Sequence, residues 1–145
     1  MLYADASAVV RAYLVDEPDQ PELARRLLEA SEPVVTSELT RIEFAGAVTR
    51  AERVGRIRVA KELIGLFDRD SGTEGRISLV PLRREPVLAT AHRISVRYGL
   101  SALDSLHLAV AMNESDSAGS ASPFVFVTRD EDQAATARAE GLDVG

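Results

Sequence analysis

The sequence contains no cysteine and no long apolar segment. Without cysteine the fold cannot depend on disulfides, and both thiolate zinc sites and cysteine nucleophiles are excluded. No segment approaches the roughly 20 apolar residues needed to span a bilayer, and no basic or apolar leader precedes Leu2. We therefore expect a soluble, cytoplasmic protein without a membrane partner. Its 145 residues are typical of one compact domain, spanning 1–145.

Lysine is also nearly absent, and basic residues are outnumbered by acidic ones, 17 to 23. The formal net charge is −6, and Lys61 is the one lysine among 17 basic residues. An acidic chain is not typical of nucleic-acid binding, because phosphate recognition usually needs a basic surface. The densest basic stretch is interleaved with apolar residues and comprises Arg50, Arg53, Arg56, Arg58 and Lys61. A solvated helical face is the simpler interpretation, and an RNA-contacting rim is the alternative.

Short β-branched or apolar runs alternate with longer helical patterns, which indicates an α/β fold with a parallel sheet. The predicted strands are Leu2–Ala4, Pro33–Thr36, Ile77–Val80 and Phe124–Val127, with a short fifth candidate at Leu142–Val144. The predicted helices are Ser7–Leu14, Pro21–Ala30, Glu38–Val54, Arg58–Asp68, Glu85–Tyr98, Ala102–Met112 and Glu131–Glu140. Two segments rich in turn formers, Asp70–Arg76 and Asn113–Pro123, predict surface loops.

Four acidic residues occupy positions that such a fold can bring to one edge of its sheet: Asp5, Glu43, Asp104 and Asp130. Ligands of open α/β sheets bind beyond the carboxyl ends of the strands. Asp5 follows the first predicted strand and Asp130 follows the fourth, so both belong to strand-to-helix turns at that edge. Glu43 and Asp104 lie in predicted helices, and each borders an apolar stripe.

Each acid also has a purely structural interpretation. Asp5 and Asp130 could be helix N-caps, and the spacing of Asp130 and Gln133 is that of a capping box, worth about 1 kcal/mol. Ser101 and Asp104 are spaced in the same way, although glutamate or glutamine is usual at the last position.

Glu43 is harder to explain structurally. We expect its carboxylate to share an inward-facing stripe, where burial is costly without a cation or hydrogen-bond partners. The other members of that stripe are Leu39, Ile42, Gly46 and Ala47. A salt bridge to Arg41 or Arg50 is the alternative.

Electrostatics favours a joint role for the four acids. Two carboxylates about 4 Å apart repel by roughly 4 kcal/mol at an effective dielectric near 20, so a cluster needs protons or a cation. All-oxygen ligands select hard ions, and Mg²⁺ or Mn²⁺ is the predicted occupant. Such an ion would hold a phosphodiester and activate water, which indicates hydrolysis of a nucleic-acid backbone.

Four segments resemble, in order, the sequence blocks of PIN-domain nucleases, and the chain is similar to the VapC toxins of bacterial VapBC toxin–antitoxin pairs. The segments are Leu2–Val10, Ser37–Glu43, Leu103–Ala109 and Val127–Asp130. The resemblance covers essentially the whole chain. It implies a three-layer α/β/α domain with a central parallel sheet of strand order 3-2-1-4-5. It also implies a Mg²⁺- or Mn²⁺-dependent endoribonuclease, the toxin component of a type II system.

The same resemblance implies roles for the acids. Asp5 and Asp104 correspond to the principal metal ligands, Glu43 completes a catalytic acidic triad, and Asp130 is the fourth, more variable acid. Asp132 is an alternative to Asp130.

Three further residues match the family pattern. Thr128 and Ser7 correspond to hydroxyls that support the site, and helix-start capping explains them equally well. His107 follows the third acid on an apolar helical face, and we expect it to be packed and hydrogen-bonded in the core rather than bound to metal.

The resemblance further implies a homodimer, an RNA substrate such as transfer or ribosomal RNA, and a VapB-type antitoxin that would occlude the site. We expect the antitoxin to dock on an apolar face of the helix pair from Arg11 to Ala30, with Leu23 and Leu27 as contacts.

Other classes are disfavoured by single residues. A receiver domain needs a well-placed lysine, and Lys61 falls inside a predicted helix. A haloacid-dehalogenase-like phosphatase needs a second aspartate two residues after the first, where this chain has Ser7. A catalytically inactive PIN-like binding module is the remaining alternative, and the intact four acids argue against it.

Overall fold

The computed structural model describes residues 1–119 and 123–145 and contains a five-stranded sheet. Its order is β3-β2-β1-β4-β5, and each neighbouring pair of strands is parallel. The strands are β1 (Leu2–Ala4), β2 (Val34–Ser37), β3 (Ile77–Val80), β4 (Val125–Val127) and β5 (Asp143–Val144). The predicted α/β class and strand order are confirmed, and the predicted strands differ from these bounds by at most one residue at either end.

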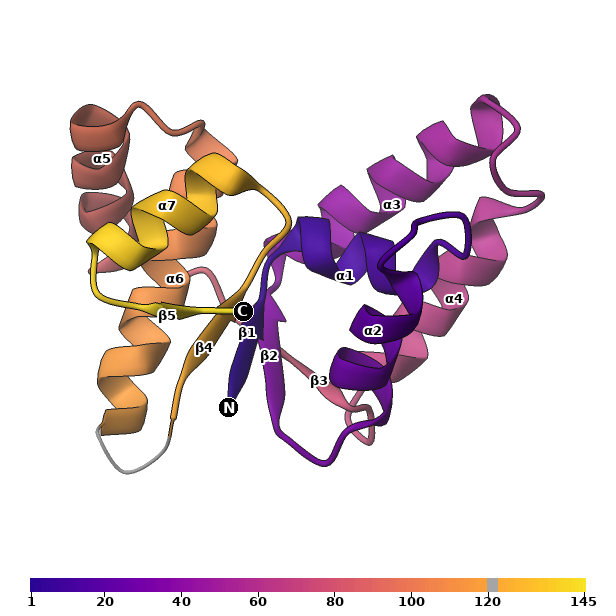
Figure 1. Cartoon of the computed structure of the whole chain (residues 1–145), viewed down its shortest axis with the longest axis horizontal. Helices are drawn as coiled ribbons and strands as arrows, with labels where there is room; N and C mark the ends of the chain where they lie inside the picture. Colours follow the sequence, from indigo (N-terminus) through magenta and orange to yellow (C-terminus); the bar gives the residue numbers. More distant parts are fainter. Residues whose placement is uncertain (120–122) are drawn as a thin grey trace.

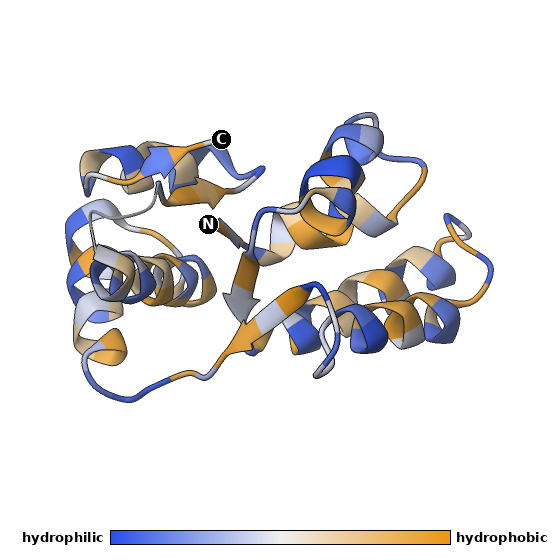
Figure 2. Cartoon of the chain, turned by 90° about the horizontal axis from the view of Figure 1, so that it is seen from below, coloured by the Kyte–Doolittle hydropathy of each residue, from blue (hydrophilic) through white to orange (hydrophobic). Residues whose placement is uncertain are grey.

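Helices cover both faces of the sheet, which confirms the three-layer α/β/α arrangement (Figure 1). One face packs against α1 (Ala6–Tyr13), α2 (Gln20–Ala24), the π-helical turn η1 (Arg25–Glu29), α3 (Leu39–Arg53) and α4 (Ala60–Asp70). The other packs against α5 (Val87–Tyr98), α6 (Ala102–Ala118) and α7 (Glu131–Ala139). The helices are banded in hydrophilic and hydrophobic colours, as expected for helices with one face on a sheet (Figure 2). None of the described helices is long and apolar enough to cross a membrane.

The short strands build two separate cores, because successive strand residues point to opposite faces. Leu2 and Ala4 of β1 pack with α1–α4, whereas Tyr3 between them packs with α5–α7. In β4, Val127 belongs to the first core and Phe126 to the second. A strand of three residues therefore anchors helices on both sides of the sheet.

The carboxyl ends of β1 and β4 lie side by side. Ala4 pairs with Val127, and the Asp5 backbone N–H donates to the Val127 carbonyl at 3.0 Å. The turns that follow these two strands carry Asp5 and Asp130, so the sheet alone makes these two acids neighbours.

Helix α6 is longer than the sequence pattern predicts. It continues to Ala118, so the first six residues of the loop predicted over Asn113–Pro123 are helical, and that part of the prediction is wrong. No glycine or proline interrupts them, and the Ser117 hydroxyl donates to a carbonyl one turn earlier. The helix ends at Gly119, whose φ of 66° favours glycine. Residues 120–122 of the predicted loop lie outside the described residues.

The docking contacts predicted on the helix pair from Arg11 to Ala30 are also wrong. Leu23 and Leu27 are 0% exposed and belong to the core beneath α1–α4. Residues that lack solvent contact cannot form a docking surface in the folded chain. Truncating either one would create a cavity in the core, at a cost of about 2–5 kcal/mol.

Candidate functional site

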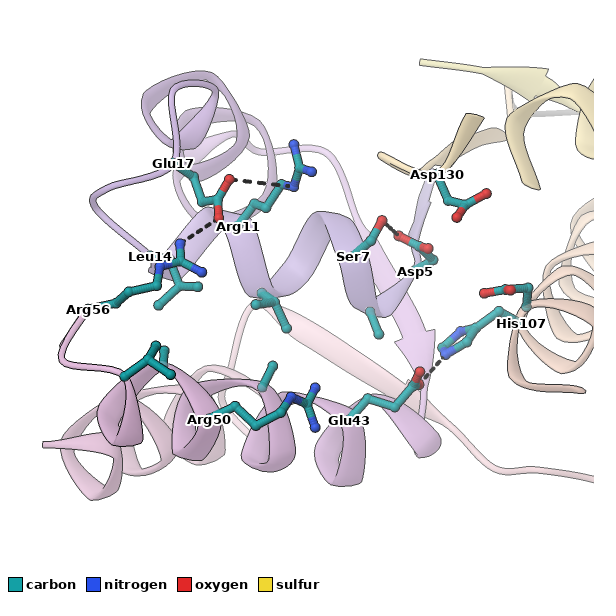
Figure 3. Close-up of a pocket in the computed structure, with 16 residues that line it drawn as sticks. Asp5, Ser7, Arg11, Leu14, Glu17, Glu43, Arg50, Arg56, His107 and Asp130 are labelled. Carbon is teal, nitrogen blue, oxygen red and sulfur yellow. Dashed lines mark hydrogen bonds and ion pairs between the residues drawn. The ribbon is translucent and has the colours of Figure 1, made fainter. Parts of the chain in front are cut away.

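One pocket collects all four predicted acids. It has a volume of about 460 Å³ and opens between α1, α3 and the N-terminal ends of α6 and α7 (Figure 3). Its lining includes an acid end, defined here as Asp5, Glu43, Asp104 and Asp130. It also includes an arginine end, defined here as Arg11, Arg50 and Arg56. The fold therefore brings together acids that lie far apart in the sequence.

Asp5 lies in the turn between β1 and α1 and is 4% exposed. Its Oδ1 accepts hydrogen bonds from the Ala8 backbone N–H at 2.9 Å and from the Ser7 hydroxyl at 2.8 Å. Its Oδ2 lies 3.0 Å from the Thr128 hydroxyl. Burial raises the pKa of this carboxyl above its ordinary value, and the hydrogen bonds oppose that rise. Asp5 is thus both the N-cap of α1 and a carboxylate of the pocket.

The hydroxyl of Thr128 faces two acceptors with one proton. Its Oγ1 lies 3.0 Å from Asp5 Oδ2 and 2.7 Å from Gln133 Oε1. The Gln133 amide nitrogen donates to the Asp104 carbonyl at 3.2 Å, so the oxygen of that amide is the atom that faces Thr128. One proton cannot serve both acceptors. An ionised Asp5 therefore lacks a full set of donors, and a cation or a proton would stabilise it.

Glu43 is held by a buried hydrogen-bonded chain. Burial raises the pKa of the Tyr3 hydroxyl well above its ordinary value, so this group stays protonated and can donate. It lies 3.1 Å from His107 Nδ1, and Nε2 of the same ring lies 2.6 Å from Glu43 Oε2. Donation from Tyr3 assigns the ring proton to Nε2, which then donates to Glu43. His107 is 2% exposed, so its expected packed and hydrogen-bonded role is confirmed.

The buried face of α3 differs from the predicted stripe. Ile42 is 74% exposed, and the buried residues of this helix are Thr40, Phe44, Val48 and Ala51. Thr40 can face the core because its hydroxyl lies 2.7 Å from that of Thr36. Glu43 consequently lies at the border of the buried face, with its side chain 24% exposed.

Neither arginine considered as a partner of Glu43 pairs with it. Arg41 binds Asp68 at 2.7 Å. Arg50 makes no ion pair with any residue within 1–119 and 123–145. Glu43 is therefore oriented by a histidine and not by an arginine.

Asp104 and Asp130 are anchored at helix starts. The Ser101 hydroxyl donates to Asp104 Oδ2 at 2.6 Å and accepts from the Asp104 backbone N–H at 3.3 Å. Asp130 caps α7, and its Oδ1 accepts from the Gln133 backbone N–H at 2.8 Å. Of the two candidates for the fourth acid, Asp130 lines the pocket and Asp132 does not.

The oxygen atoms of the acid end fit a hard divalent cation by their chemistry. Glu43, Asp104 and Asp130 each use one carboxylate oxygen in the bonds above, and the other oxygen accepts no hydrogen bond from the described residues. In that part of the chain, however, no three His, Asp or Glu side chains converge closely enough to form a ready metal site. Mg²⁺ commonly binds one or two carboxylates and keeps several waters, so full convergence is not required.

Mutual repulsion, which the sequence led us to expect, is not the main electrostatic feature of this end. The leading cause of the raised Asp5 pKa is burial, and the three other carboxylates are not among its main causes. The acids line one pocket, and within residues 1–119 and 123–145 no three of them converge on one point. A cation or a proton at Asp5 would therefore offset desolvation of this carboxylate more than repulsion between neighbouring acids.

Sequence reasoning missed two positioning residues. The sequence pattern predicts that Tyr3 is one apolar residue of a strand and that Gln133 is one of the two residues of a capping box. In the structure both are fully buried, and each bonds to groups that hold a pocket carboxylate. Strand alternation places Tyr3 on the face opposite Leu2, but only the position of α6 reveals its partner His107.

At the arginine end, two of the three arginines are held by acids of the α1–α2 loop. Arg56 donates to both carboxylate oxygens of Asp16, at 2.7 and 3.0 Å, and to Glu17 at 2.6 Å. Arg11 lies 3.7 Å from Glu17 and 3.5 Å from Asp19. Of the basic stretch predicted as either a helical face or an RNA rim, Arg50 and Arg56 line the pocket. Its other members do not.

Comparison with known proteins identifies the family. The sequence model of the PIN domain matches residues 2–139. No curated protein sequence matches the chain.

Among solved structures, the chain is similar to VapC20 of Mycobacterium tuberculosis, described as a sarcin-ricin loop cleaving toxin. The TM-score is 0.67 at 17% identity, covering 98% of this chain and 96% of that one. It is also similar to FitAcB from Neisseria gonorrhoeae, with a TM-score of 0.63 at 21% identity, covering 99% and 96%. At these identities the structures establish the fold, and the match over residues 2–139 establishes that the chain belongs to the PIN domain family.

Proposed function

We propose that this PIN domain is a Mg²⁺- or Mn²⁺-dependent endoribonuclease, the toxin component of a type II toxin–antitoxin system. The observation that carries the proposal is the single pocket lined by Asp5, Glu43, Asp104 and Asp130. These acids come from four separate parts of the chain, and each is oriented by hydrogen-bond donors of the chain, with no arginine or lysine paired with it among the described residues.

Asp5 and Asp104 would be the principal ligands of a divalent cation, with Glu43 and Asp130 completing the site. The cation would supply Lewis-acid polarisation of the scissile phosphodiester and of the attacking water. In-line hydrolysis of this kind leaves 5′-phosphate and 3′-hydroxyl ends.

The chain's own residues hold the acid end in position. Ser7 and Thr128 orient the two oxygens of Asp5. The Tyr3 and His107 pair fixes Glu43, because the ring accepts a hydrogen bond at Nδ1 and donates one at Nε2. Preorganisation of this kind lowers the cost of reorganising the carboxylates during the reaction.

Biological partners follow from the same proposal. The similarity to a toxin described as cleaving the sarcin-ricin loop supports a structured RNA, such as ribosomal or transfer RNA, as the substrate class. A cognate VapB-type antitoxin would occlude the pocket, and a homodimer in the cytoplasm is the expected form of the toxin.

The test is cleavage of total and defined RNA by the purified chain, with Mg²⁺ or Mn²⁺ and with EDTA. We expect cleavage that requires the cation and is lost in Asp5→Asn and Asp104→Asn. Asp132→Asn is the matched control, because it removes an exposed carboxylate outside the pocket and should cleave like wild type. Unchanged cleavage in both Asp5→Asn and Asp104→Asn would sink the proposal.

Two further measurements complete this test. The cation should raise the melting temperature (Tm) of the wild type and not that of Asp5→Asn, since ligand binding to the folded state stabilises it. Mapping of cleaved ends across cellular RNA after induction, with Asp5→Asn as control, would identify the target and the chemistry of its ends.

A further inference from the structure

We infer that Arg50 binds a phosphate of the RNA strand next to the scissile one, so that the two ends of the pocket hold neighbouring phosphates. This inference rests on the proposed function and assigns a substrate-binding role to a residue at the arginine end.

Arg50 lies on the same face of α3 as Glu43. The residues of α3 and its C-cap that line the pocket are Glu43, Ala47, Arg50, Ala51 and Val54. Seven residues of helix separate Glu43 from Arg50, or about 10 Å along the axis. The Arg50 side chain folds back along the helix, and its Nη1 would lie 3.3 Å from a Cβ placed on Gly46. Its guanidinium is directed toward Glu43 (Figure 3).

Arg50 is the arginine of this end whose donors are free. Arg56 and Arg11 are engaged by Asp16, Glu17 and Asp19. Arg50, in contrast, is exposed and makes neither an ion pair nor a side-chain hydrogen bond within residues 1–119 and 123–145. A guanidinium offers a planar set of N–H donors that matches two phosphate oxygens at once.

The charge of the pocket explains why one free arginine matters. The chain is acidic overall, and acidic residues outnumber arginines in the pocket lining. A phosphate at the acid end would depend on a bound cation. A neighbouring phosphate has no such cation, and Arg50 is the nearby positive group that can receive it. Because this contact would form equally in the bound and transition states, it should act on substrate affinity.

The binding test measures fluorescence anisotropy of a labelled single-stranded RNA across a KCl series. The protein is Asp5→Asn in EDTA, so that metal-dependent hydrolysis is blocked. We expect Arg50→Ala to weaken binding about tenfold and to reduce the slope of log K against log salt by about 0.7, the value for one phosphate of a single strand. Arg50→Lys should recover part of the loss, because it restores charge without the planar fork.

Arg53→Ala is the matched control. It removes the same charge from the same helix, and Arg53 is exposed and outside the pocket. We expect its binding to stay within about twofold of the parent protein. Equal effects of Arg50→Ala and Arg53→Ala would overturn the inference and leave Arg50 free for another partner, such as an acidic protein segment. Because Arg50 is exposed, Tm measurements on every variant should show that each one folds.

Cleavage by the otherwise wild-type protein with Mn²⁺ gives the second readout. Arg50→Ala should raise KM about tenfold with kcat within about threefold, as expected for uniform binding. A fall in kcat at constant KM would place Arg50 on the scissile phosphate and contradict the inference as stated. If the wild type fails to cleave RNA, the proposed function fails. The inference alone fails under a different set of results: the wild type cleaves RNA, Asp5→Asn does not cleave it, and Arg50→Ala and Arg53→Ala bind RNA equally well.

Discussion

At the acid end of the pocket the carboxylates are oriented by hydroxyls, backbone N–H groups and a histidine, whereas at the arginine end two of the three charges are bound by opposite charges. Asp5 is the clearest example of the first arrangement, with donors from Ala8, Ser7 and Thr128. Arg56 is the clearest example of the second, with Asp16 and Glu17 around it.

The difference separates orientation from neutralisation. Hydrogen bonds from hydroxyl and amide groups orient a carboxylate and leave its charge available to a cation. Ion pairs cancel the charges that they bring together. The acid end is therefore suited to bind an ion, while most of the arginine end is occupied by the protein itself. Arg50 is the exception on which the inference above depends.

The largest expected effect comes from removing charge at the acid end. If the proposed function holds, Asp5→Asn and Asp104→Asn should each reduce RNA cleavage by about 100-fold or more, because several kcal/mol of transition-state stabilisation would depend on the cation. Asp5→Asn should nevertheless keep or raise the Tm. Asparagine is a good N-cap, and its amide can donate to Thr128, whose own proton then serves Gln133. A large loss of stability would instead indicate a purely structural role.

Removal of the hydroxyl that orients His107 should have a smaller, two-part effect. Tyr3→Phe leaves Nδ1 of a buried ring without its partner, so we expect a loss of about 1–3 kcal/mol in the free energy of unfolding. Cleavage should fall by about 10-fold to 100-fold, because Glu43 loses a fixed donor. Tyr13→Phe is the control, since it removes a 2.6 Å bond to Asp70 outside the pocket. It should lower stability without changing kcat.

The pH dependence of stability tests the burial of Asp5. Its pKa is raised above the ordinary value of 3.8, so between that value and the raised one the folded state binds a proton that the unfolded chain releases. The contribution of this carboxyl to stability is therefore complete below pH 3.8 and is lost as pH rises through the folded-state pKa. The Tm of Asp5→Asn relative to wild type should rise with pH across this window. A pH-independent difference would contradict the assignment.

The smallest effect is expected from the ion pairs of the arginine end. The side chains of Arg56 and Asp16 are each 40% exposed, and exposed pairs add little to stability. Arg56 nevertheless lowers the pKa of the Asp16 carboxyl. Arg56→Ala and Asp16→Ala should each change the Tm by no more than about 4 °C. The coupling between the two substitutions should weaken in 0.5 M KCl. A larger, salt-independent coupling would show that the two ends do not differ as described.

Local chemistry made much of the fold predictable. Asp5 and Asp130 combine strand-end positions with capping residues, so both their helix starts and their shared edge of the sheet could be expected. The extension of α6 was not predicted, because the polar residues after Met112 are typical of a loop. Up to Ala118 these residues contain no glycine or proline that would end a helix. The buried face of α3 was misplaced because Thr40 counts as polar in a pattern and becomes buried once Thr36 satisfies its hydroxyl.

The sequence by itself determined where strands and helices follow one another along the chain and which residue types lie near the pocket. Periodicity, capping and turn chemistry decide these features because they act over a few neighbouring residues. It did not determine which partner each charged group has. Glu43 pairs with His107, 64 residues away, and not with the arginines on its own helix. Leu23 and Leu27 are core residues and not a docking face. Such pairings depend on how helices pack across the sheet, where contacts form between residues far apart in the chain, and only the tertiary structure decides them.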